Sequence, residues 1–149
     1  MTLFGLQRVG LVPGLNLESG ANDMKAAIVT GAGKTPVYGE FEAPVAKAGE
    51  EIISVRASAL SHLSKARASG SHYSSDGVFP AIAGVDGVGV TRDGKRVYFV
   101  LPDAPYGALA ELCPVSPRRC LELPDSVDDI TAAAIANPIV QAGTVAPVQ

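Results

Sequence analysis

The chain has 149 residues and carries 12 Lys and Arg against 15 Asp and Glu, which gives a net charge of −3 at neutral pH. This length suits a single domain, and 47% apolar with 18% charged residues is typical of a soluble globular protein. The mild acidic excess excludes the basic footprint of a nucleic-acid-binding protein, and no stretch reaches the ~18 apolar residues of a membrane span. We therefore expect no nucleic-acid and no membrane partner.

The expected elements begin at Met24, because residues 1–23 show no hydrophobic period and are interpreted as a flexible extension. The content of 16 Gly and 11 Pro favours short strands and turns over a helical bundle. Glycines inside the predicted strand Ile82–Val90 indicate a close backbone approach or a bulge. In the predicted strand Glu51–Ala59, the alternate residues Ile53, Val55, Ala57 and Ala59 are expected on one face. The predicted strands are Lys25–Thr30, Val37–Phe41, Glu51–Ala59, Ile82–Val90, Lys95–Leu101 and Ala108–Cys113.

Two helices are expected. The first covers Ser61–Ser69 and is closed by Gly70. The second begins with Ser126 as its N-cap and an acidic residue three positions later, and the dipeptide Asn137-Pro138 is expected to end it. Its buried face is predicted from the helical spacing. The fold class is thus mainly β, a partly open barrel with two or more short helices. The residues predicted on that helical face are Val127, Ile130, Ala133 and Ala134.

The two cysteines, Cys113 and Cys120, lack the spacing of a disulfide framework and are interpreted as reduced thiols. The histidines, His62 and His72, stand ten residues apart and form no close pair with each other or with the cysteines. Because a zinc site normally shows such a pair, no metal is expected. The N-terminus lacks the uninterrupted apolar run of a secretory leader, and a cytoplasmic location is the expectation.

Three glycine-rich segments resemble nucleotide-binding loops without matching them. Gly33-Lys34-Thr35 is followed by Pro36 where a helix would have to begin, and Gly89–Lys95 is followed by Arg96 in place of the Ser or Thr that binds magnesium. Both are interpreted as turns. Gly84–Gly89 has its glycines in the wrong order for a dinucleotide fingerprint and lies within a strand.

Two candidate sites remain open at the level of residue types. Tyr73 lies in a polar loop and is either a substrate contact or a core residue. Ser61, His62 and Asp86 supply the residue types of a nucleophilic triad, but adjacent Ser and His rarely reach the required geometry. Polar residues at the start of a helix are the alternative interpretation of that pair.

A series of short motifs follows a recognisable order along the chain. None is specific alone, and their combined order is what carries information. They are Met24-Lys25-Ala26-Ala27, Ala57-Ser58-Ala59-Leu60-Ser61, Arg67-Ala68-Ser69-Gly70, Pro80 with Gly84, Asp86, Gly87 and Gly89, Gly94-Lys95-Arg96-Val97-Tyr98, Gly107-Ala108-Leu109-Ala110-Glu111, and Leu123-Pro124-Asp125 before an alanine-rich helix and Asn137-Pro138.

This order resembles the GroES-like N-terminal catalytic domain of the medium-chain dehydrogenases/reductases over about Met24 to Gln141. Within that superfamily it is similar to the zinc-independent quinone oxidoreductases. Zinc alcohol dehydrogenases carry a ligating Cys and a ligating His at positions that look like Ser61 and Val85 here. Serine is a poor zinc ligand and valine is none, so the resemblance implies a site without zinc.

The resemblance implies hydride transfer from NADPH to a quinone or a conjugated carbonyl. Without zinc, hydrogen-bond donors must meet the charge that develops on the carbonyl oxygen. Ser61, His62 and Tyr73 are the catalytic candidates, and His62 or Tyr73 is the candidate proton donor. Residues just after the Asn-Pro turn approach the nicotinamide in the family, which makes Asn137 and Gln141 the cofactor-binding candidates.

The expected organisation is an extension over 1–23, a GroES-like catalytic domain over 24–138 and a tail over 139–149 where the family's nucleotide-binding domain begins. The chain is thus expected to be a truncated oxidoreductase that is inactive by itself, and apolar surface left exposed is expected to favour a homo-oligomer. The alternative is a stand-alone GroES-like β-barrel that serves in binding or assembly without catalysis.

Overall fold

The computed structural model of the chain describes residues 23–60 and 77–143, and for residues 137–143 it describes the backbone. Strands dominate this part of the chain, which confirms the mainly-β prediction. The elements are β1 (Asp23–Val29), β2 (Val37–Glu42), β3 (Glu51–Ala57), β4 (Ala81–Ile82), β5 (Asp86–Val90), β6 (Arg96–Val100), β7 (Leu112–Val115), the 3-10 helix η1 (Pro117–Arg119), β8 (Cys120–Glu122) and α2 (Asp129–Gly143).

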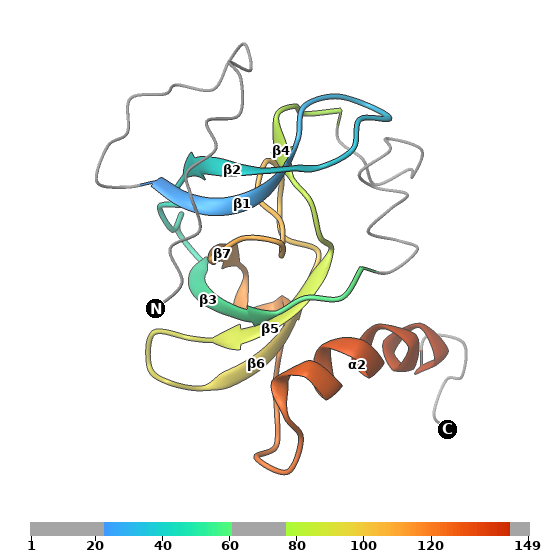
Figure 1. The fold of residues 1–149 in the computed structure, drawn as a ribbon. Coiled ribbons are helices and arrows are strands. Elements are labelled where there is room, and N and C mark those ends of the chain that lie inside the picture. Colours follow the sequence, from blue (N-terminus) through green and yellow to red (C-terminus); the bar gives the residue numbers. More distant parts are fainter. Residues whose placement is uncertain (1–22, 61–76, 144–149) are drawn as a thin grey trace, which may run out of the picture.

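The strands form two antiparallel sheets, shown in Figure 1. One sheet has the order β2-β1-β4 and the other has the order β7-β3-β5-β6-β8. The segment before β7 joins them, because the amide of Ala27 donates to Leu109 O at 2.8 Å and the amide of Glu111 donates to Lys25 O at 3.1 Å. This connection gives the partly open barrel that the residue pattern predicts.

The core of the five-stranded sheet contains side chains of low polarity from three of its strands, β3, β6 and β7. Ile53 and Phe99 are fully buried there, and the residues that alternate with Ile53 on β3, Ser54 and Arg56, are exposed. The two-residue period of the third predicted strand is therefore confirmed as far as Arg56. A bulge between Val55 and Ala57 interrupts it, Ala57 packs with the cluster around Val88 and Tyr98, and the strand ends at Ala57 and not at Ala59. The buried members of this cluster are Ile53, Val97, Phe99, Ala108, Cys113 and Val115.

The prediction of one strand over Ile82–Val90 is wrong, because the structure divides it between the two sheets. β4 pairs with β1, whereas β5 pairs with β3 and β6. The chain crosses over at Gly84, which has φ +98°. A Cβ atom there would lie 2.8 Å from the amide nitrogen of Leu109, so both the backbone angle and the close approach require glycine.

The predicted strand Ala108–Cys113 is displaced to β7, Leu112–Val115, because residues 108–111 form the connection between the sheets. Pro114 lies in β7 without disrupting it, since β7 is at an edge of its sheet. The short elements η1 and β8 were not predicted, and three-residue elements carry little periodicity. The predicted helix over Ser61–Ser69 lies outside the described residues.

The predicted start of α2 is also wrong. Ser126 is not the N-cap, because the helix begins at Asp129 and the carboxylate of Asp128 accepts hydrogen bonds from the amide and hydroxyl of Thr131, at 2.8 and 2.7 Å. These bonds hold the pKa of Asp128 below its usual value. The first amides of a helix have no partner within the helix, and the Asp128 carboxylate accepts from one of them, that of Thr131.

The end and the buried face of α2 differ from the prediction as well. The helix runs through Asn137-Pro138 to Gly143, since a proline inside a helix costs about 3 kcal/mol but does not forbid the helix from continuing. Of the predicted face, Ala133 is buried and Val127 is half-buried beside it, as expected, whereas Ile130 and Ala134 are exposed. Ala132, which was not predicted on that face, is buried.

Candidate functional site

A buried polar pair lies between the five-stranded sheet and α2. Asp86 is the first residue of β5 and is 1% exposed, and Tyr98 on the neighbouring β6 is 3% exposed. The Tyr98 hydroxyl donates a hydrogen bond of 3.0 Å to Asp86 Oδ2. Tyr98 pairs with Val88 in the ladder, so both polar groups lie on the face that Val88 shares.

The end of β3 is attached to this pair. Ser58 Oγ donates to the backbone oxygen of Asp86 at 2.8 Å. The chain leaves the described part at Leu60, two residues beyond Ser58, and returns at Gly77. Ser58, which contacts the backbone of Asp86, is therefore close in the chain to the start of the segment 61–76.

The three catalytic candidates, Ser61, His62 and Tyr73, lie in that segment and outside the described residues. Their assignment stays a prediction. What the structure adds is a buried carboxylate, Asp86, next to the point where the chain enters the segment.

α2 covers the buried pair. Ala132 and Ala133 pack with Val88 and Tyr98 in one cluster of buried residues, and Figure 1 shows the helix alongside β5 and β6. The cofactor-binding candidates, Asn137 and Gln141, both fall on the backbone of this helix, one turn apart in its C-terminal half. Their side chains are outside the described part of the structure, so their role stays a prediction.

Val85 is the residue that the sequence resemblance matches to a ligating histidine of zinc alcohol dehydrogenases. It is 1% exposed, and its backbone oxygen accepts a hydrogen bond from the amide of Leu101 at 2.6 Å. Its apolar side chain is packed into the protein and offers no donor atom to a metal. Across residues 23–60 and 77–143, no three His, Cys, Asp or Glu side chains gather as a metal site would need.

The segment with near phosphate-loop spacing is the hairpin between β5 and β6. The amide of Gly94 donates to Thr91 O at 3.0 Å and the amide of Thr91 donates to Lys95 O at 2.9 Å. A β-strand, not a helix, follows this turn, so no helix N-terminus is available for a phosphate. The interpretation as a turn is confirmed. The other near match is also a turn, closed by the amide of Lys34 and Gly31 O.

The sequence pattern did not identify the Asp86–Tyr98 pair. The residue types group Asp86 with Ser61 and His62 or with the neighbouring glycines, and Tyr98 stands only in the motif that begins at Gly94. One signal was present: a carboxylate at the start of a strand with continuous small and apolar residues must be buried, and a buried carboxylate needs a donor.

Burial, together with the charge of Asp86 and the hydrogen bond to it, raises the pKa of Tyr98 well above its ordinary value of 10.0. The folded protein therefore keeps the Tyr98 proton at a pH where the unfolded chain loses it. The free energy of unfolding must then fall as the pH rises above about 10, by up to about 1.4 kcal/mol per pH unit from this group.

We expect Tyr98→Phe to make this alkaline loss shallower, because phenylalanine has no proton to lose. Urea denaturation at pH 8, 10 and 11 measures the effect, with Tyr38→Phe, at an exposed position on β2, as the matched control. Tyr106 and Cys120, whose pKa values burial also raises, leave a smaller slope in the variant. An unchanged slope in Tyr98→Phe contradicts the assignment.

Within the described residues, no helix has the length and apolar character needed to cross a membrane.

Comparison with solved structures finds the same fold in several oxidoreductases. The quinone oxidoreductase of Thermus thermophilus, also solved with NADPH, has a TM-score of 0.66 and 26% identity, covering 83% of this chain and 42% of its own. The human synaptic vesicle membrane protein VAT-1 homolog-like protein has a TM-score of 0.73 and 21% identity, with coverage of 83% and 43%.

The quinone oxidoreductase of Coxiella burnetii has a TM-score of 0.64 and 19% identity, with coverage of 81% of this chain and 45% of its own. The chain therefore spans less than half the length of each of these structures. No protein-family model and no curated protein matches the sequence.

Proposed function

We propose, on the premise that the chain has the GroES-like fold of medium-chain dehydrogenases/reductases, that it is the substrate-side domain of an NADPH-dependent, zinc-independent oxidoreductase. Its substrate class is a quinone or a conjugated carbonyl. The observation that carries the proposal is the fold that this chain shares with quinone oxidoreductases. In this chain the buried, apolar Val85 stands at the position that the resemblance matches to a zinc ligand. The structural neighbours are oxidoreductases of this superfamily.

The chain by itself fits only part of a nicotinamide site. No segment of its sequence has the glycine order of a dinucleotide fingerprint, so the phosphates and the adenosine must be held elsewhere. When bound, the cofactor supplies a hydride to the substrate. This domain would contribute the C-terminal half of α2, at Asn137 and Gln141, toward the nicotinamide side.

The chemical task of the domain is to hold the substrate oxygen and to stabilise its developing charge. Hydrogen-bond donors can do so when they are fixed in a site that excludes water. We assign this role to Ser61, His62 and Tyr73, with His62 or Tyr73 giving the proton. The Asp86 carboxylate, 3.0 Å from the Tyr98 hydroxyl, lies at the start of β5 and is buried.

Because the hydride donor is held elsewhere, the 149-residue chain is expected to bind a quinone weakly and to catalyse no reduction. A ¹⁵N NMR titration with a fully substituted, water-soluble 1,4-benzoquinone tests binding, since such a quinone has no ring position at which Cys113 or Cys120 could add. We expect shifts in the amide signals of Ser58, Asp86 and the start of α2. Shifts confined to β2, on the other sheet, would contradict the proposal.

Two variants sharpen this titration. Tyr73→Phe and His62→Leu are expected to weaken quinone binding by about 3–10-fold each, because each variant lacks the hydrogen-bond donor of the original side chain. Tyr38→Phe is the matched control, because Tyr38 is 69% exposed on β2 and lies outside the proposed site. Equal quinone affinities in all three variants would show that neither Tyr73 nor His62 donates a hydrogen bond to the quinone. A chain that binds no quinone at all would favour the alternative of a binding or assembly module.

A further inference from the structure

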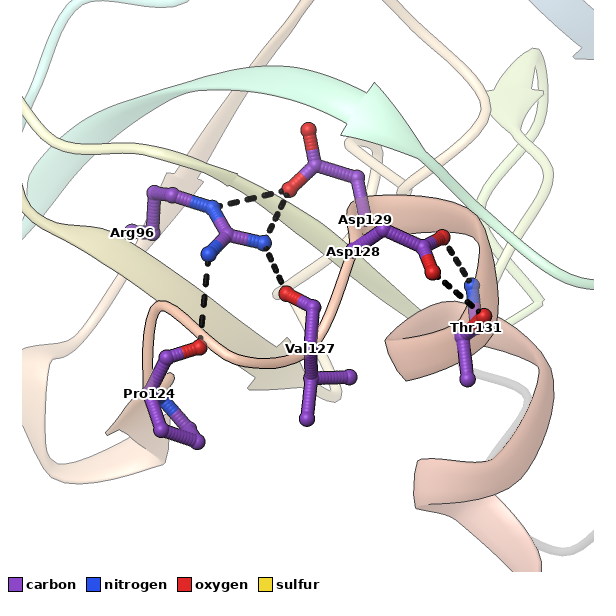
Figure 2. A network of polar contacts seen from close by, with 6 residues as sticks. All are labelled: Arg96, Pro124, Val127, Asp128, Asp129 and Thr131. Carbon is purple, nitrogen blue, oxygen red and sulfur yellow. Dashed lines mark hydrogen bonds and ion pairs between the residues drawn. The ribbon is translucent and has the colours of Figure 1, made fainter.

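The attachment of α2 to the sheet depends on one guanidinium group, shown in Figure 2. Arg96, the first residue of β6, donates from Nε and Nη2 to Asp129 Oδ1 at 3.0 and 2.8 Å. Nη2 also donates to Val127 O at 2.6 Å, and Nη1 donates to Pro124 O at 3.4 Å. We call this set the Arg96 clamp. It binds both the first residue of the helix and the segment that leads into it.

The apolar contact that the first half of α2, residues 129–136, makes with the sheet is small by comparison. The helical residues buried there against Val88 and Tyr98 are Ala132 and Ala133, with Ala136 half-buried beside them. The two large apolar side chains of this half are exposed, Ile130 to 77% and Ile135 to 46%. Alanine methyl groups remove little apolar surface from water, so they hold the helix weakly.

The helix is stabilised by a different group from the one that attaches it. The capping bonds run from Thr131 to Asp128, within the helix start itself, whereas the clamp runs from Arg96 on the sheet to Asp129 (Figure 2). Loss of the clamp therefore leaves the N-cap of α2 in place. Helix formation and helix attachment can be separated by substitution.

We propose that α2 is a hinged cover held closed by the Arg96 clamp, and that opening the clamp lifts the helix from β5 and β6 and uncovers the Asp86–Tyr98 pair. The hinge is the segment between the end of β8, Glu122, and the start of α2. The movement of α2 does not depend on the proposed function, because it concerns access to the Asp86 carboxylate and the Tyr98 hydroxyl. The clamp bonds, the small contact made by the alanines and the exposed isoleucines support it.

Hydrogen exchange of the 149-residue chain tests the cover. In Arg96→Ala, the amides of Ala132 and Ala133 are expected to exchange about tenfold faster or more, because bonds to a charged group are lost. The amides of the sheet, such as those of Val88 and Phe99, should keep their rates. Lys95→Ala is the matched control, since Lys95 is a neighbouring, exposed cation whose one ion pair, with Asp93, spans 3.9 Å.

Two further variants keep the test decisive if Arg96→Ala folds poorly. Asp129→Asn removes the carboxylate charge and leaves the bond to Val127 O, so a smaller acceleration is expected. Arg96→Lys cannot reproduce the forked contact and should fall between wild type and Arg96→Ala. Helix and sheet amides that accelerate equally in these variants would mean global unfolding and would overturn the proposal, as would unchanged helix rates.

A second readout follows the covered group itself. The tyrosinate absorbance of the chain is titrated with pH in wild type, Tyr98→Phe and Arg96→Ala. The step present in wild type and absent in Tyr98→Phe is the titration of Tyr98. In Arg96→Ala this tyrosine should titrate at a lower pH, near that of an exposed tyrosine, with Asp86 its remaining charged neighbour. A Tyr98 titration unmoved by Arg96→Ala would show that the helix does not cover the pair through the clamp.

Discussion

Replacing Phe99 by alanine is expected to lower the free energy of unfolding by about 3–5 kcal/mol, the usual cost of removing a buried aromatic side chain. Phe99 is fully buried in the cluster between β3, β6 and β7, and its ring also lies where a Cβ atom on Gly87 would come within 3.0 Å of it. Neighbouring strands therefore pack against it on more than one side. Urea denaturation monitored by circular dichroism measures the loss.

Two variants make this prediction specific. Phe99→Leu retains part of the volume and should cost less than Phe99→Ala, because the residual cavity is smaller. Leu121→Ala removes an exposed side chain on β8 and should change stability by less than about 0.5 kcal/mol. Equal losses for Phe99→Ala and Leu121→Ala would contradict the location of the core.

The second large effect is expected at Gly107, in the connection that joins the sheets. A Cβ atom at this position would lie 2.2 Å from the backbone oxygen of Ile82 and 2.5 Å from that of Ala83. Because backbone atoms cannot rotate away as a side chain can, the crossing between β4 and β5 would have to move. We expect Gly107→Ala to destabilise the protein by about 3 kcal/mol, at the upper end of overpacking effects.

Gly31→Ala is the control for this effect. Its added Cβ would meet only Lys34 Cγ, at 3.6 Å, which is an ordinary contact. The variant should be neutral or slightly more stable, by up to about 1 kcal/mol, because alanine restricts the unfolded chain. The two denaturation midpoints are compared directly. A Gly107→Ala midpoint that matches the Gly31→Ala midpoint would show that the crossing tolerates a side chain.

The alternation in the middle of β3 could be predicted from the sequence, since Ile53 is buried while Ser54 and Arg56 are exposed, but the bulge between Val55 and Ala57 could not. The division at Gly84 could not be predicted, because a local pattern does not show that Leu109 approaches the backbone there. Residues 108–111 have a strand-like composition, but their backbone partners include Ala27 of β1 and Ala83 and Gly84, just after β4, all far away in the chain. Such choices depend on tertiary pairing and not on local propensity.

The helix shows the same limit. Ser126 and Asp128 both suit an N-cap, and the Arg96 clamp, which binds Val127 O and Asp129, favours a start at Asp129. The clamp joins residues about thirty positions apart and leaves no periodic signal. For the site, the sequence provides the candidates Ser61, His62 and Tyr73, which lie in the segment 61–76. The buried partnership of Asp86 with Tyr98 needed the register of β5 and β6.

We propose that this chain supplies the substrate side of a reductase whose nucleotide is held by a separate domain. Calorimetric titration of the 149-residue chain with NADPH tests this proposal most directly. We expect no saturable heat at NADPH concentrations up to about 1 mM, corresponding to a binding free energy weaker than about −4 kcal/mol. Binding with a micromolar Kd would contradict it, because the nucleotide site would then lie within these residues.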